Sequence, residues 1–132
     1  MITDAKKIKI KEMLRPNIVA CTGKDWSDSE YDEYFITEYT EPKIIEIDDD
    51  NFFTYKVGAY IWLQDFVSDN KKKAKSLLDK IIIIQNENEL DVKCQVQISN
   101  IRIINILVKS GFKIIDLMGY NYIIELRYKH GR

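Results

Sequence analysis

The fold is decided by the stretch VKCQVQISNIRIINILVKSGF, which runs from Val92 to Phe112. Its first seven residues alternate between apolar and polar side chains, a pattern that predicts a strand with one buried face. Ser99 or Asn100 can then cap a helix, because its side-chain oxygen accepts hydrogen bonds from otherwise unpaired backbone N–H groups. Apolar residues at helical spacing follow, and Gly111 suits the left-handed position just past a helix end. The stretch therefore predicts a strand, a short helix and the start of another strand.

The same signals extend this pattern over most of the chain. Ser27 and Glu30 have the spacing of a capping box, with Trp26 and Tyr31 at hydrophobic-staple spacing.

Alternating lysines over 6–13 are typical of a protected edge strand. Pro16 is expected to break the chain after that strand. Strands are expected over 6–13, 43–47, 52–55, 59–67, 90–98, 112–117 and 120–128, and helices over 28–40, 72–85 and 100–110. The strands at 52–55 and 59–67 can also be one long strand with Gly58 as a bulge. This order predicts an α+β fold, a mixed sheet with helices on its faces.

Composition bounds the remaining possibilities. The 132 residues suit one domain over 1–132, and 45% hydrophobic residues with two prolines argue against disorder. A net charge of −1 gives no reason to expect nucleic acid or a membrane as partner. Cys21 and Cys94 are too few for a disulfide framework, and no signal peptide is visible, so a cytoplasmic location is expected. The single histidine, His130, leaves no convincing metal site, and no metal is expected.

Negative charge is concentrated in one segment. Between Asp25 and Asp50 lie eleven acidic residues against one base, Lys43. A solvated acidic face explains such a run. An acidic lip that attracts a cationic amine substrate is the alternative.

The decisive stretch resembles the C-terminal half of the GNAT superfamily of acyl-CoA-dependent N-acetyltransferases. Members often read N-x-x-A-x-x-L-Y-x-K-x-G-F here, and the residues in the same register are Asn100, Ile103, Ile106, Leu107, Lys109, Gly111 and Phe112. The segment from Gly58 to Val67, followed by a helix with Leu77 and Leu78, resembles the family's centre. The resemblance covers roughly 44–128 and implies a mostly antiparallel GNAT-like sheet, acetyl-CoA as co-substrate, and a small-molecule or peptide amine as acceptor. Pairing as a homodimer, frequent in the family, is a further expectation.

In that family two neighbouring strands splay apart, and the loop leaving the first presents backbone N–H groups to the cofactor's pyrophosphate. The resemblance places the splay between the strand ending at Val67 and the strand at 90–98, with the backbone of Phe66 and Val67 aligning the pantetheine. The family's loop usually reads Q/R-x-x-G-x-G/A, but 69–74 here reads DNKKKA, and only Ala74 fits. The cofactor-binding residues expected from the resemblance and from the lysine cluster are Phe66, Val67, Asn70, Lys71, Lys72, Lys73, Ala74, Lys75 and Asn100. An ordinary solvated helix end, with Asn100 as a cap alone, is the competing interpretation.

The family's general acid is a tyrosine seven residues after the asparagine, and that position is Leu107. Tyr120 and Tyr122 are the candidate substitutes, because a phenol can protonate a departing thiolate; otherwise they are ordinary aromatic residues of a terminal strand. Asp65 is the candidate base for the amine. The resemblance thus implies direct attack of an amine on acetyl-CoA. A catalytically inactive binding or regulatory module of the same fold, or a small self-pairing interaction protein, remains the alternative.

Overall fold

The computed structural model describes residues 2–129, so His130 lies outside the described residues. The chain forms two compact units, one up to Lys43 and one from Ile44 onward, and each is described by itself. A single domain over 1–132 stays a prediction.

The first unit consists of two helices, α1 (Asp4–Thr22) and α2 (Asp28–Glu38). The strand expected over 6–13 is wrong, because these residues lie inside α1. The Thr3 side chain caps the helix by accepting a hydrogen bond from the Lys6 backbone N–H at 3.2 Å. Lysine, glutamate and methionine favour a helix over a strand once such a cap is present. Pro16 does not end the helix, which continues to Thr22.

The capping box of α2 is confirmed. Ser27 Oγ accepts from the Glu30 N–H at 3.2 Å, and the Ser27 N–H donates to Glu30 Oε1 at 3.1 Å. The Trp26 and Tyr31 rings meet edge to face at 5.3 Å, as the staple spacing predicts. The Tyr31 hydroxyl also donates to Asp25 at 2.5 Å, and this bond contributes most to holding the pKa of Asp25 below its usual value.

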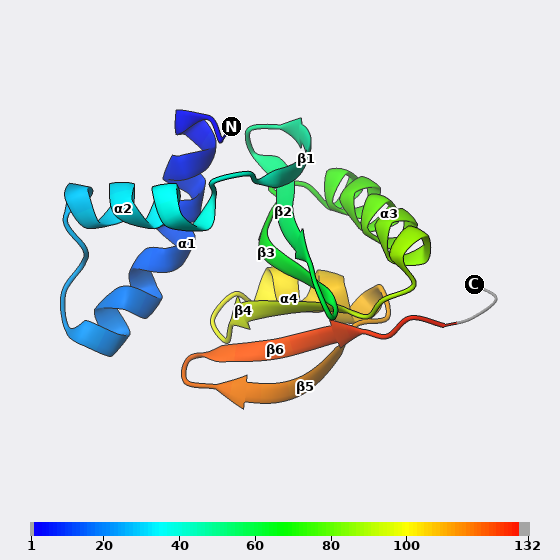
Figure 1. The fold of residues 1–132 in the computed structure, drawn as a ribbon. Coiled ribbons are helices and arrows are strands. Elements are labelled where there is room, and N and C mark those ends of the chain that lie inside the picture. Colours follow the sequence, from blue (N-terminus) through cyan, green and yellow to red (C-terminus); the bar gives the residue numbers. More distant parts are fainter. Residues whose placement is uncertain (1, 130–132) are drawn as a thin grey trace. The chain divides into compact units, whose positions relative to one another are not determined.

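The second unit is a six-stranded sheet with two helices (Figure 1). Its strands are β1 (Lys43–Asp48), β2 (Asn51–Val57), β3 (Ile61–Val67), β4 (Val92–Gln97), β5 (Lys113–Met118) and β6 (Asn121–Leu126), and its helices are α3 (Lys71–Asn88) and α4 (Ile101–Lys109). The spatial order is β1-β2-β3-β4-β6-β5. The pairs β2–β3, β4–β6 and β5–β6 are antiparallel, and β3–β4 is parallel. The mixed, mostly antiparallel sheet is confirmed, with two separate strands on either side of Gly58.

One hydrophobic core joins α3, α4 and one face of the sheet, here called the core face. Its centre includes Leu77, Ile81, Val92 and Leu107, each with at most 1% of its surface exposed. Cys94 lies among them, and burial raises the pKa of its thiol to about 12. Among the described residues, no helix combines the length and the apolar character that crossing a membrane requires.

Candidate functional site

The parallel strands β3 and β4 separate halfway along their length. Their ladder consists of three residue pairs, from Ile61–Val92 to Leu63–Cys94. Both strands continue, and each stays paired on its other side, β3 with β2 as far as Val67 and β4 with β6 as far as Gln97. Figure 1 shows the two strands running in different directions beyond this point. The predicted divergence is therefore confirmed.

A β-bulge in β3 marks the point of separation. Thr54 of β2 lies opposite Asp65, whereas the next residue, Tyr55, lies opposite Leu63, so Gln64 has no partner across the ladder. An extra residue bends its strand and reverses the alternation of side chains beyond it. Leu63 therefore lies on the core face, and Asp65 shares the opposite face with Thr54. The bend turns the second half of β3 away from β4.

The loop that leaves β3 is held by a buried asparagine instead of being shaped by glycines. Asn51 is fully buried, and its Oδ1 accepts from the Ser68 hydroxyl at 2.8 Å and the Asp69 N–H at 3.1 Å. Its Nδ2 donates to Asp48 at 2.9 Å and to Asp69 at 2.8 Å. A carboxamide with all these partners fixes the loop in one conformation.

The first turn of α3 carries its own cap and one engaged lysine. Asn70 Oδ1 accepts from the backbone N–H groups of Lys72 at 2.9 Å and Lys73 at 3.1 Å. The Lys73 ammonium donates to Asp48 at 2.7 Å. This bond, helped by the Asn51 amide, lowers the pKa of Asp48 to about 2, and Asp48 in turn raises the pKa of Lys73. Of the four predicted phosphate-binding lysines, Lys73 is thus already engaged.

The first turn of α4 approaches the same loop. Asn100 caps α4 through the Ile103 N–H at 3.4 Å, as predicted. The Arg102 guanidinium donates to the Ser68 backbone carbonyl, which lies just after β3. This hydrogen bond connects α4 to the exit of β3 beyond the point where the strands separate. Sequence reasoning missed Arg102, because a single arginine in a helix carries no signal of a contact 34 residues away.

The candidate acid and base residues lie on different strands. Asp65 is 5% exposed and accepts a hydrogen bond from the Thr54 hydroxyl at 2.5 Å. Tyr122 lies opposite Val96, in the separated half of β4. Tyr120 is 54% exposed in the turn before β6, and its carbonyl accepts from the Ile98 N–H at the end of β4. Leu107 is fully buried in the core and has no proton to donate.

The structure thus brings most of the predicted site residues to the two separated strand halves and the helices that follow them. Phe66 and Val67 lie on the separated half of β3, with Phe66 buried on the core face. Ala74 is fully buried on the inner side of α3, which places its methyl group in the core. Among residues 2–129 there is no group of three or more histidine, cysteine, aspartate or glutamate side chains that could hold a metal ion.

No protein-family model and no curated protein matches the sequence. Solved structures do match. The chain is similar to a PaiA N-acetyltransferase from Thermoplasma acidophilum in complex with coenzyme A, with a TM-score of 0.60 and 16% identity over 95% of this chain and 93% of that one. It is also similar to Ard1 from Thermoplasma volcanium (TM-score 0.61, 13% identity, 98% and 97% covered). A third similar structure is Arabidopsis thaliana Naa50 in complex with the bisubstrate analogue CoA-Ac-MVNAL (TM-score 0.56, 14% identity, 96% and 95% covered).

The resemblance found in the sequence is confirmed at the level of architecture. The chain has the GNAT fold of these N-acetyltransferases, and its own two central parallel strands separate after three residue pairs. At 13–16% identity, this likeness establishes the fold alone.

The bulge at Gln64 can be tested directly. Deleting Gln64 restores a regular alternation from Ile61 to Phe66, so β3 can continue straight beside β4. We expect the amides of 95–97 that face β3 to gain ladder hydrogen bonds and to exchange more slowly with deuterium, measured by NMR. Gln64→Ala keeps the extra residue and serves as the control, with native exchange. Unchanged exchange in the deletion variant would contradict a bulge-driven separation.

The Lys73–Asp48 pair predicts a pH dependence. Because the folded-state pKa of Asp48 lies below its ordinary value of about 4, the pair stabilises the fold above that pH. This contribution is lost as the pH falls toward 2. In Lys73→Met we expect the Asp48 carboxyl to titrate closer to pH 4, followed by carbon NMR, and the stability difference from the native protein to shrink in acid. Lys80→Met, at an exposed position of the same helix, should leave the titration of Asp48 unchanged.

Proposed function

We propose that this protein is an acetyl-CoA-dependent N-acetyltransferase that acetylates an amine by direct attack. The observation that carries the proposal is the separation of β3 and β4 at the Gln64 bulge, in a chain whose fold matches N-acetyltransferases solved with coenzyme A. An inactive module would have no need to keep two central strands apart, since closing them would complete the sheet.

The separated strands suit the pantetheine arm of the cofactor. Beyond Leu63 and Cys94, the ladder between the two strands does not continue. Pantetheine carries two amide groups, so it can pair with a strand edge much as an added strand does. The backbone of Phe66 and Val67 on one side, and Asn100 at the start of α4, are the groups placed to hold it.

The phosphates of acetyl-CoA would be bound by cationic side chains instead of by the backbone of a glycine-rich loop. Lys71, Lys72 and Lys75 lie in the first two turns of α3, and Arg102 reaches the same loop from α4. Cations at a helix N-terminus oppose its dipole, by roughly 0.3–1 kcal/mol each, and a bound anion reverses that penalty. The amides of Lys72 and Lys73 are held by Asn70, so a phosphate that binds them takes the place of the Asn70 side chain.

The reaction needs one group to remove a proton and one to supply it. Bound acetyl-CoA supplies the acetyl group as a thioester. Asp65 accepts the proton of the acceptor's ammonium, which frees the nitrogen lone pair. The new N–C bond then forms as the C–S bond breaks, and the phenol of Tyr120 or Tyr122 donates a proton to the sulfur. The nitrogen, positively charged after the attack, gives up its second proton through water to the phenolate, and the proton on Asp65 leaves to solvent. Positioning of the two reactants contributes the larger part of the rate.

Calorimetry with acetyl-CoA tests the binding site. We expect saturable binding by the native protein, a loss of about tenfold or more in Lys72→Glu, because a carboxylate replaces a cation beside the phosphates, and native affinity in Lys80→Glu. Deletion of Gln64 should abolish binding without unfolding the protein. Absence of heat with the native protein at millimolar acetyl-CoA would eliminate the proposal.

The role of Asp65 is tested by the pH dependence of Asp65→Asn. We expect kcat/KM at neutral pH to fall about a hundredfold or more, because the general base is removed. The deficit should shrink at high pH, where the acceptor amine is already neutral. A deficit that stays constant with pH would mean that Asp65 acts only through its structural bond to Thr54. Asp116→Asn, at an exposed position on β5, is the matched control.

A further inference from the structure

One row of side chains crosses the sheet on the face opposite the core. Successive strand pairings place Lys56 beside Trp62, Trp62 beside Lys93, and Lys93 beside Glu125. Two lysines therefore flank one tryptophan. The Lys93 ammonium lies 3.9 Å from the Glu125 carboxylate and 4.5 Å from the centre of the Tyr60 ring, within the range of a cation–π interaction.

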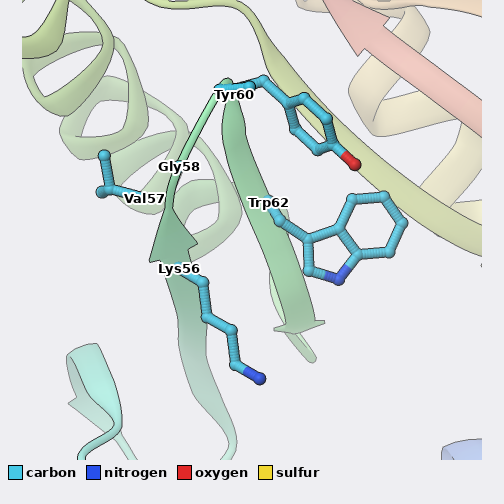
Figure 2. Close-up of a pocket in the computed structure, with 6 residues that line it drawn as sticks. Lys56, Val57, Gly58, Tyr60 and Trp62 are labelled. Carbon is cyan, nitrogen blue, oxygen red and sulfur yellow. The ribbon is translucent and has the colours of Figure 1, made fainter.

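Next to this row the surface has a hollow of about 410 Å³, lined by Lys56, Val57, Gly58, Ala59, Tyr60 and Trp62. Figure 2 shows Lys56, Tyr60 and Trp62 projecting from one side of the β2–β3 hairpin and Val57 from the other. The Tyr60 and Trp62 rings meet edge to face at 6.2 Å. Gly58 and Ala59 add little side-chain bulk, so the aromatic pair remains accessible. The hollow falls within the usual size range of small-molecule sites.

The hollow adjoins the candidate site. On β2, Lys56 and Thr54 are two residues apart on the same face, and their partners on β3 are Trp62 and Asp65. Because the bulge absorbs Gln64, Trp62 and Asp65 are consecutive side chains on that face, about 7 Å apart by strand spacing. The ladder between β3 and β4 ends between them, after Leu63.

The charges around Trp62 and Asp65 determine which end of an acceptor lies at which residue. Asp65 carries the carboxylate that favours an ammonium group. The lysine amines of Lys56 and Lys93 lie in the row of Trp62, where a second ammonium is disfavoured by repulsion. An acceptor therefore gains most by placing its nitrogen at Asp65 and an uncharged, flat group on the Trp62 ring.

We propose that the Tyr60–Trp62 hollow binds the aromatic group of the acceptor, so that the substrate class is primary amines with an aromatic ring two or three carbons from the nitrogen. This inference rests on the proposed transferase function for the position of the amine. The spacing of about 7 Å between the two side chains matches that tether length. A flat ring gains a stacking contact with the indole that a saturated ring of the same carbon count lacks.

The first measurement needs no turnover. The sequence contains two tryptophans, so Trp26→Phe leaves Trp62 as the sole indole fluorophore. Titration of this variant with 2-phenylethylamine, without cofactor, should give a saturable change in emission, with several-fold tighter binding than 2-cyclohexylethylamine. Equal affinity for the two amines, or no saturable change, would overturn the inference.

The second measurement is acetyl transfer to the same two amines. Trp62→Ala should raise KM for 2-phenylethylamine about tenfold and KM for 2-cyclohexylethylamine by less, which removes the preference, and should not change the affinity for acetyl-CoA. Trp62→Phe retains an aromatic surface and should keep most of the preference, and Ile83→Ala, at an exposed position of α3, should behave as native.

The two measurements separate the two ideas. Acetyl-CoA binding and transfer without preference between the amines would contradict aromatic binding at the hollow and would support the transferase function. Preferential binding of 2-phenylethylamine at Trp62 without any binding of acetyl-CoA would support aromatic binding at the hollow and would contradict the transferase function.

Discussion

The β-bulge at Gln64 is the constraint on which the site depends. A parallel pair of central strands normally hydrogen-bonds along its whole length, because every unpaired backbone group in the interior costs free energy. Here β3 inserts one residue against β2, and its ladder with β4 stops at the neighbouring residue, Leu63. The same insertion moves Asp65 to the face away from α3 and α4. One extra residue thus both separates the strands and places the carboxylate.

Holding the strands apart requires firm anchors on either side. Gln85 of α3 donates its side-chain amide to the Leu126 carbonyl at 2.8 Å, which fixes the helix to β6 opposite Val92, at the end where β4 is still paired with β3. Asn51 fixes the loop after β3 through three hydrogen bonds to Ser68 and Asp69, and Arg102 connects that loop to α4. The family's glycines provide close approach of backbone to phosphate. In this chain, side-chain hydrogen bonds shape the loop instead, and the nearby cations lie on α3, which begins with three lysines, and on α4, which carries Arg102.

The sequence predicts those parts of the fold in which several local signals agree. From Val92 to Phe112, strand alternation, an asparagine cap, an apolar helical stripe and a terminal glycine all indicate the same elements, and the structure has them. Over 6–13 the signals conflict, because alternating isoleucines suggest a strand while lysine and glutamate suit a helix. The Thr3 cap decides for the helix, in which Ile10 is buried and Ile8 is 56% exposed. A local signal for the bulge is also present, since apolar residues at 61, 63 and 66 break the two-residue period. The roles of Asn51 and Arg102 have no such signal, because their partners lie 17 to 34 residues away.

The departure from the family pattern at Leu107 matters less for the chemistry than the need for a neutral amine does. Leu107 occupies the position of the usual acid, but it is buried in the core, and its replacement by a polar group would disturb packing there. An alkyl thiol has a pKa of roughly 8.5, so a thiolate is a fair leaving group at neutral pH even with modest assistance. A deprotonated amine, in contrast, is indispensable, since an ammonium has no lone pair for attack. A site for this reaction must therefore remove a proton from the amine and align the amine with the thioester. In the proposed mechanism both of these tasks would fall on the short segment from Trp62 to Val67, which contains the bulge, the Asp65 carboxylate and one wall of the aromatic hollow.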